Sequence, residues 1–189
     1  MKNNNGAIFW FTGLSGSGKT TLASAVAEKL KNNNINVYLL DGDVLRTGLC
    51  CDLSFGDKDR KENIRRAGEV AKLFMNEGYL VLCTFISPFS SDRETIRASC
   101  PTGKFHEIYI STPIEECERR DPKGLYAKAR KGIIPNFTGI DSPYESTATP
   151  DLEIDTTCLS VDEAALKFIT HFELAIAELD PSNLRKDYV

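Results

Sequence analysis

Apolar residues along this chain concentrate in short runs that are separated by longer, mixed stretches. The runs lie at residues 7–12, 37–40, 80–86, 105–111 and 152–155. The run at 80–86, Leu-Val-Leu-Cys-Thr-Phe-Ile, is apolar almost throughout. Such a run is typical of a strand that is covered on both faces, as at the centre of a parallel sheet. We therefore predict five strands, most of them buried.

Between these runs, apolar residues recur at helical spacing, as Leu22, Val26 and Leu30 do. Helices are expected at about 21–30, 57–76 and 90–98, from 112 onward, and at about 160–179. Thr112 and Pro113 are expected to be the cap and the first residue of the fourth helix. Alternating strands and helices predict an α/β fold. Its form is a three-layer sandwich, with a five-stranded parallel sheet flanked by helices on both faces.

Residues 121–150 interrupt this alternation with a stretch rich in charge, glycine and proline. An insertion of this kind often forms a lid over a site, and the alternative is an inert excursion on the surface. No repeat or low-complexity linker divides the chain. We expect one domain over residues 1–189, with the lid at about 121–150. The polar tail from Pro181 is expected to be loose.

Composition narrows the function classes. The 189 residues carry a net charge of −4, which argues against a dedicated nucleic-acid binder. No apolar run approaches the length of a membrane span, so no membrane partner is expected. The residues before the first strand show no signal peptide. The cytoplasm is the expected compartment.

The six cysteines form no Cys-x-x-Cys pair and no zinc-like cluster with a histidine. Most are expected to be small buried hydrophobic residues. Cys50 and Cys51 are the exception, because they lie in a polar loop. His106, at the start of a strand, and His171, within a helix, are expected to be structural or surface residues.

A phosphate-binding loop follows the first strand. Residues 13–20, Gly-Leu-Ser-Gly-Ser-Gly-Lys-Thr, fit the pattern of a glycine, four residues, then Gly-Lys-Thr. Backbone N–H groups of such a loop surround a phosphate, and the helix N-terminus adds to the attraction. The expected nucleotide-binding residues here are Gly13, Ser15, Gly16, Ser17, Gly18, Lys19, Thr20 and Thr21. Lys19 is expected at the β- and γ-phosphates of ATP, and Thr20 at Mg²⁺.

Two other interpretations of this loop are weaker. A Gly/Ser-rich loop without a ligand is disfavoured by its place between a strand and a helix. A dinucleotide site is excluded, because Gly16 and Gly18 are not followed by a third glycine at the required position.

A second chemical centre is expected where the strand at 37–40 ends, because ligands of parallel sheets bind at the carboxyl ends of strands. Asp41 and Asp43 follow that strand directly. A carboxylate there can hold Mg²⁺, the role expected of Asp41, or accept a proton from an attacking hydroxyl. The alternative is a simple Asp-Gly turn.

Arginines follow this centre, and their forked guanidinium groups suit phosphate and sulfate. They are Arg46, Arg60, Arg65 and Arg66. For Arg65 and Arg66, a solvated basic helix face remains the equal alternative.

The order of several motifs, from about residue 7 to 157, resembles the adenylylsulfate (APS) kinases, members of the P-loop kinase superfamily. The motifs are Leu-Asp-Gly-Asp at 40–43, Arg46, Asp-Leu-Ser-Phe at 52–55, Asp-Arg at 59–60, Glu-Asn-Ile-Arg-Arg at 62–66, Phe-Ile-Ser-Pro at 85–88, Arg-Asp-Pro-Lys-Gly-Leu-Tyr at 120–126, and Phe-Thr-Gly-Ile-Asp at 137–141. Val44 and Ser54 depart from the family pattern, which has Asn and Gly there.

The resemblance implies transfer of the ATP γ-phosphate to the 3′-hydroxyl of adenosine 5′-phosphosulfate (APS), with Mg²⁺. The product is 3′-phosphoadenylylsulfate (PAPS). The implied residue roles, by matched position, are as follows: Lys19, Asp43 and Ser87 are catalytic; Arg46, Arg60 and Asn63 contact the phosphosulfate; Phe55 and Phe137 enclose the APS adenine; Lys123 neutralises charge between the nucleotides; and Cys158 lines the ATP adenine pocket. A homodimer and a functional link to an ATP sulfurylase are also implied.

Ser87 is described in the family as a phosphorylated intermediate, but in-line transfer needs no such step. A turn serine before Pro88 is its plain interpretation. Two alternative functions remain for the chain. One is another small-molecule kinase of the same fold, and the other is a nucleotide-binding regulatory domain without catalysis.

Overall fold

The computed structural model describes residues 6–179, so the predicted loose tail from Pro181 lies outside the described residues. Within that range five parallel strands form one sheet in the order β2-β3-β1-β4-β5. The strands are β1 (Ala7–Thr12), β2 (Val37–Asp41), β3 (Leu80–Thr84), β4 (Phe105–Ile110) and β5 (Leu152–Ile154). The helices are α1 (Lys19–Asn32), α2 (Gly42–Thr47), α3 (Asp57–Asn76), α4 (Ser90–Ser99), α5 (Ile114–Arg120), α6 (Leu125–Arg130) and α7 (Val161–Leu179).

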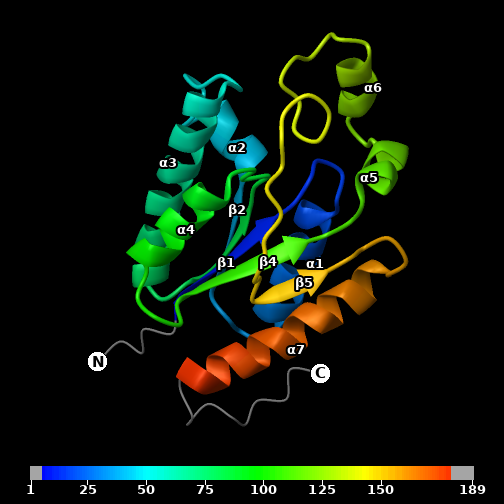
Figure 1. Ribbon diagram of the computed structural model, residues 1–189. Coiled ribbons are helices and arrows are strands. Elements are labelled where there is room, and N and C mark those ends of the chain that lie inside the picture. Colours follow the sequence, from blue (N-terminus) through cyan, green and yellow to red (C-terminus); the bar gives the residue numbers. More distant parts are fainter. Residues whose placement is uncertain (1–5, 180–189) are drawn as a thin grey trace.

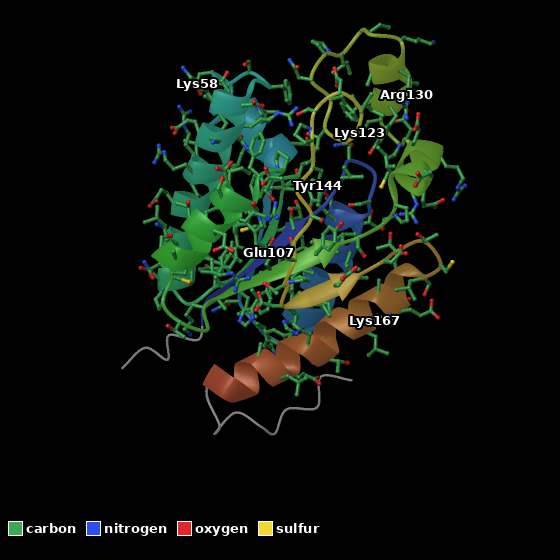
Figure 2. All side chains as sticks on the ribbon, in the orientation of Figure 1. Lys58, Glu107, Lys123, Arg130, Tyr144 and Lys167 are labelled. Carbon is green, nitrogen blue, oxygen red and sulfur yellow. The ribbon has the colours of Figure 1, made fainter. Side chains whose placement is uncertain are left out.

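Helices cover both faces of the sheet, which confirms the predicted three-layer sandwich (Figure 1). Side chains of a strand alternate between faces. Phe9 and Phe11 of β1 therefore join the core under α1 and α7, whereas Ile8 and Trp10 join the core under α3 and α4. Charged residues such as Lys58 and Lys167 point away from these cores (Figure 2).

The central strand β1 marks the point where the chain changes direction across the sheet. It pairs with β3 on one side and with β4 on the other. At such a switch point, two strand ends diverge and leave a crevice at the carboxyl edge. The loop after β1 opens into this crevice, as do the ends of β2 and β3.

Local differences from the sequence expectations have physical causes. The Asp-Gly-Asp stretch begins helix α2 rather than a loop, because the Asp41 carboxylate caps it by accepting a hydrogen bond from Asp43 N. Strand β3 ends at Thr84 rather than residue 86, since Thr84 pairs with Asp41, the last residue of β2. Helix α7 begins with a capping box, in which Ser160 N donates to Glu163 Oε2 at 2.8 Å and Glu163 N donates to Ser160 Oγ at 3.2 Å.

The expected cap of the fourth helix is wrong. Helix α5 begins at Ile114 with Pro113 before it. The Thr112 hydroxyl donates instead to Ser17 O, at 3.2 Å. Thr112 therefore supports the phosphate loop, a long-range contact that a local cap pattern does not contain.

All six cysteines are free, and three of them, Cys50, Cys83 and Cys117, are buried. Cys51 is exposed, but the expectation that Cys50 shares the polar surface is wrong, because its side chain is fully buried at the end of α2. Within residues 6–179, no helix is long and apolar enough to cross a membrane.

The lid contains a helix, α6, and has an apolar cluster of its own. Tyr126, Ala129 and Phe137 form that cluster together with Cys117 of α5. Figure 1 shows α5, α6 and the loop after them at the carboxyl end of the sheet. The segment is thus packed over the crevice rather than extended into solvent.

Candidate active site

The phosphate loop joins β1 to α1 in a conformation that requires glycine. Gly16 has φ +75°, and a Cβ added there would lie 2.9 Å from Cys117 O. The loop is held from outside by Thr156 Oγ1, which donates to Ser17 O at 2.9 Å, and by Tyr126 OH, which donates to Ser15 O at 3.0 Å. A lid residue and the segment after β5 therefore both support the loop.

Lys19 folds back over this loop. Its Nζ donates to Gly13 O at 2.9 Å and to Leu14 O at 2.6 Å. The pKa of Lys19 is lowered to about 8, chiefly by burial and in part by nearby Lys123, against the smaller opposing effects of Asp43 and Asp41. The amino group is therefore a desolvated cation at the mouth of the loop, where an anion would stabilise its charge.

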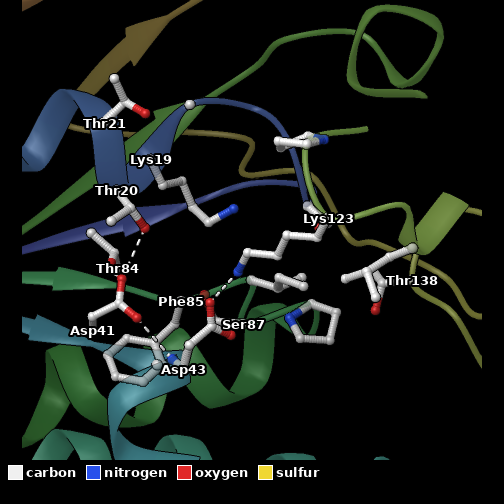
Figure 3. Close-up of a pocket in the computed structure, with 18 of the residues that line it drawn as sticks. Lys19, Thr20, Thr21, Asp41, Asp43, Thr84, Phe85, Ser87, Lys123 and Thr138 are labelled. Carbon is white, nitrogen blue, oxygen red and sulfur yellow. Dashed lines mark hydrogen bonds and ion pairs between the residues drawn. The ribbon is translucent and has the colours of Figure 1, made fainter. Parts of the chain in front are cut away.

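Asp41 and Thr20 place two oxygen atoms side by side. Thr20 Oγ1 donates to Asp41 Oδ2 at 2.8 Å, and Thr84 Oγ1 donates to the same atom at 2.7 Å (Figure 3). Burial raises the pKa of Asp41, but hydrogen bonds from Thr84 and Thr20 outweigh it, so the net shift is downward. An ionised carboxylate beside a hydroxyl is a donor set that fits Mg²⁺.

Asp43 is the second residue of α2, and its side chain contacts the lid. Lys123 Nζ forms an ion pair with Asp43 Oδ2, and both side chains line the main cavity (Figure 3). The structure thus brings together the expected proton acceptor and the expected charge neutraliser.

The expected acceptor residues gather on the other side of the same cavity. The Arg46 guanidinium lies 4.4 Å from the centroid of the Phe55 ring, and its Nη1 donates to Ser54 O at 3.1 Å. Arg60 Nε donates to Phe55 O at 2.7 Å. Phe55 is 61% exposed, so its ring has a face open to a ligand.

Arg60 and Phe137 connect this region to the lid. Arg60 contacts Thr138 Oγ1 and Asn136 O. Phe137 is buried, packs edge-on against Tyr126 with ring centroids 5.0 Å apart, and also lines the cavity. It is therefore both a packing residue of the lid and a wall of the site.

Asn63 is buried on α3 and lines the cavity. Among the residues that the structure describes, its Oδ1 has no hydrogen-bond partner. A buried polar atom of this kind is costly unless a ligand or water satisfies it. Asn63 is thus the acceptor-side residue with the clearest sign of a missing ligand.

Ser87 lies in a turn with left-handed backbone, φ +40°, and is buried at the cavity wall. Its Oγ accepts from Trp10 Nε1 at 3.1 Å and donates to Thr12 Oγ1 at 2.9 Å. The hydroxyl proton is therefore engaged beneath the site rather than directed at a phosphate.

Most of the residues expected at the site line one cavity of about 1030 Å³. They are Ser15, Gly16, Gly18, Lys19, Thr20, Thr21, Asp41, Asp43, Arg46, Phe55, Arg60, Asn63, Ser87, Lys123 and Phe137. Gly13 and Ser17 of the same loop do not line the cavity. Gly13 O accepts a hydrogen bond from Lys19 Nζ, and Ser17 O accepts one from Thr156 Oγ1. Cys158 is exposed and is not part of the wall, whereas its neighbours Thr156 and Leu159 are.

Arg65 and Arg66 lie outside this wall. Arg65 pairs with Glu62, and Arg66 pairs with Glu62 and Asp52. The solvated basic face is thus the interpretation that their contacts favour.

Arg120 and Thr156 are among the wall residues that the sequence did not assign to the site. Arg120 Nη1 donates to Thr156 Oγ1 at 2.8 Å, and Nη2 donates to Thr156 O at 2.8 Å. Both residues line the cavity next to the phosphate loop. Arg120 opens the Arg-Asp-Pro-Lys motif, which was a usable signal, whereas nothing local distinguishes Thr156.

Comparison with known proteins agrees with this arrangement. The adenylylsulphate kinase family model matches residues 5–155. The adenylyl-sulfate kinase of Marinobacter nauticus is 52% identical over 172 residues, which are 91% of this chain and 86% of that protein. The bifunctional enzyme NodQ of Azospirillum brasilense is 53% identical over 169 residues, but these are 89% of this chain and only 27% of NodQ.

A solved structure is also close. The Mycobacterium tuberculosis APS kinase CysC, in complex with AMPPNP and APS, matches with a TM-score of 0.85 and 48% identity. The match covers 89% of this chain and 98% of that one. On the family model and on relatives similar over most of its length, this chain belongs to the adenylylsulfate kinase family.

Proposed function

We propose that the chain transfers the γ-phosphoryl group of ATP to the 3′-hydroxyl of APS, giving PAPS and ADP, and that it does so as a single domain with a lid. One observation carries the proposal: the phosphate loop and the acceptor residues line one cavity of about 1030 Å³. Ligand pockets usually hold about 300–1,000 Å³. A cavity at the top of that range suits two nucleotides that meet end to end.

The donor half of the cavity is the phosphate loop with Lys19 and Thr20. Backbone N–H groups of the loop and the Lys19 ammonium bind the ATP phosphates. Thr20 and Asp41 are the residues that would hold Mg²⁺, which, when bound, neutralises charge on the phosphates. Thr156 and Arg120 border this half, and Cys158 lies just outside it.

The acceptor half is the surface between α2, α3 and the lid. The open face of Phe55 and the ring of Phe137 supply aromatic surface for the adenine of APS. Arg46 and Arg60 supply hydrogen-bond donors for the phosphosulfate, and the unpartnered amide oxygen of Asn63 supplies an acceptor for a hydroxyl or amino group of the same nucleotide. This set fits an acceptor that is both planar and strongly anionic, which a sugar or a nucleoside is not.

In phosphoryl transfer the protein mainly positions the two reactants and stabilises the charge that develops between them. Asp43 accepts the proton of the 3′-hydroxyl as that oxygen attacks the γ-phosphorus, and ADP leaves in line. Lys123 then compensates the charge that accumulates between the two nucleotides. Ser87 positions the cavity wall and carries no phosphoryl group, since its proton is engaged by Thr12.

Three further properties belong to the proposal. The cytoplasm is the compartment that suits six free cysteines. A homodimer follows the family resemblance. A functional link to an ATP sulfurylase follows from chemistry, because APS has to be formed by a reaction that joins sulfate to the adenylyl group of ATP.

A panel assay tests the proposed function. The protein would be incubated with ATP, Mg²⁺ and, separately, APS, adenosine and a set of sugars, and ADP release would be followed. Release with APS alone supports the proposal. Preferential release with a sugar or nucleoside would favour another small-molecule kinase, and nucleotide binding without any release would favour a regulatory domain.

A further inference from the structure

A buried ion pair lies beneath the acceptor side of the site. Arg93 of α4 is 2% exposed, and its Nε donates to Glu107 Oε1 of β4 at 2.5 Å. Removing two charges from water is costly, and their mutual attraction seldom repays it unless the remaining donors are also satisfied. The partners of the other guanidinium nitrogens therefore indicate what the pair is for.

Those nitrogens reach two different segments of the chain. Arg93 Nη1 donates to Ser87 O at 2.7 Å. Arg93 Nη2 donates to Glu145 O at 2.9 Å and to Thr147 Oγ1 at 3.2 Å. The guanidinium thus bridges the turn at the cavity wall and the segment by which the chain leaves the lid.

The return segment, residues 144–147, carries the chain from the lid toward β5. Five further hydrogen bonds join it to the body of the protein: Tyr144 OH with Thr12 Oγ1 at 2.9 Å, Glu145 N to Pro88 O at 2.8 Å, Ser90 N and Ser90 Oγ each to Glu145 Oε2 at 2.7 Å, and Thr147 Oγ1 to Glu107 Oε1 at 2.7 Å. Figure 2 shows Tyr144 between Lys123 of the lid and Glu107 of the sheet.

The turn on the other side of Arg93 needs support. Ser87 is a non-glycine residue at φ +40°, a conformation that persists only when its surroundings hold it. Its hydroxyl is held by Trp10 and Thr12, and its carbonyl by Arg93. Ser87 and Pro88 line the cavity, so their position defines part of its wall.

We infer that Arg93 is a positioning residue for the acceptor substrate: its guanidinium fixes the Ser87 turn and the return segment to each other. The lid then lies at a set position over the acceptor half of the cavity. This inference rests on the proposed function, since it takes APS as the acceptor. Arg93 itself does not line the cavity and acts through Ser87 and the lid.

The geometry needs the fork of arginine and not only its charge. A lysine at position 93 would keep a cation beside Glu107, but one ammonium group on a narrow stem cannot bond Ser87 O and the return segment together. Arg93→Lys therefore keeps the positive charge beside Glu107 and removes the hydrogen bonds that join the two segments. Arg97→Lys is the matched control, because Arg97 lies one turn further along α4 and pairs with Asp151 and Glu107.

The experiment combines kinetics with hydrogen exchange, well below the melting temperature. For Arg93→Lys we expect the KM for APS to rise about tenfold, because small displacements of positioning groups are costly. The KM for ATP should stay within about twofold, as the phosphate loop holds ATP elsewhere. In this variant, hydrogen exchange of the backbone amides should become faster at residues 85–89 and 137–147 and remain unchanged in α1 and α7. Arg97→Lys should resemble the wild type in all of these.

An unchanged KM for APS, or quicker exchange in every element, would overturn the inference and leave Arg93 as a stability residue. If Arg93→Lys does not fold, Thr147→Val decides in its place. It removes one hydroxyl from the bridge and should raise the KM for APS about threefold, and no rise would overturn the inference. If the wild type does not phosphorylate APS, the proposed function fails. The hydrogen-exchange measurement, which needs no substrate, still tests whether Arg93 holds the Ser87 turn and the return segment together.

Discussion

Lys123 of the lid forms an ion pair with Asp43, 80 positions earlier in the chain, at the wall of the main cavity (Figure 3). Both side chains are largely exposed, and exposed ion pairs contribute little to stability. The contact is therefore better explained by the proposed function, in which Asp43 accepts the proton of the acceptor hydroxyl and Lys123 compensates charge beside it.

Replacement of Asp43 by Asn tests the role of that carboxylate. The variant keeps the size of the side chain but loses the proton acceptor, so kcat with APS should fall about 10²- to 10⁴-fold. ATP affinity, measured by calorimetry, should change little. A collapse of ATP affinity with kcat maintained would assign Asp43 to the nucleotide instead. Asp162→Asn, at an exposed site on α7, is the control and should match the wild type.

ATP binding should depend on pH through Lys19. Without ligand, burial holds the pKa of Lys19 at about 8, so the amino group loses its charge as the pH rises through that value. Bound phosphates favour the charged form and raise the pKa. Binding above pH 8 therefore takes up a proton, and affinity should fall by up to about tenfold per pH unit until the pKa of the complex is passed.

Calorimetry in buffers of different ionisation enthalpy measures that proton uptake directly. Lys19→Arg, which stays charged, should bind ATP without uptake between pH 8 and 9. Equal uptake in the wild type and in Lys19→Arg would show that another group titrates. Lys19→Ala should lower turnover at least about a hundredfold with the fold intact.

The aromatic pair is tested by Phe55→Ala and Phe137→Ala. Stacking contributes on the order of 1–3 kcal/mol per base, so loss of either face should weaken APS binding roughly tenfold to a hundredfold. Phe55 is exposed, and its removal should leave the melting temperature unchanged. Phe137 packs on Tyr126, so its removal should also lower the melting temperature. Unchanged APS affinity in both variants would show that the two rings do not enclose the adenine of APS.

Ser87→Ala distinguishes direct transfer from a phosphorylated serine. Since the hydroxyl is bonded to Trp10 and Thr12, its removal should cost stability of about 1–3 kcal/mol. Turnover should remain within about tenfold of the wild type. Complete loss of turnover in a folded variant, or a phosphoserine trapped in the wild type by mass spectrometry, would contradict direct transfer.

The sequence was sufficient for the sheet, its flanking helices and the phosphate loop, because these follow from local periodicity and from a motif with fixed spacing. It did not predict α2, which depends on the Asp41 side chain acting as a cap. Nor did it predict the long-range contacts of Thr112 and Thr156 with the phosphate loop. These two contacts join residues 95 and 139 positions apart and leave no local pattern.

On the acceptor side, Asp43 and the arginines could be anticipated from their chemistry and position, but the aromatic pair could be anticipated only through family resemblance. Arg46 lies in α2, Phe55 in the loop before α3 and Phe137 in the lid, and no periodicity joins them. No sequence pattern indicated the Arg93 bridge, since an arginine in a polar helix is usually a surface residue. Its burial becomes visible only once Glu107 and the return segment are placed.

The position of the transferred phosphate tests the central claim most directly. Phosphorus NMR of a reaction with ATP, Mg²⁺ and APS should show a new phosphomonoester signal coupled to the ribose proton at C3′, appearing in step with ADP. The Asp43→Asn protein should give this signal at least about a hundredfold more slowly. A phosphomonoester at C2′, or ATP consumption without any phosphorylated APS, would contradict the claim that this cavity joins ATP to the 3′-hydroxyl of APS.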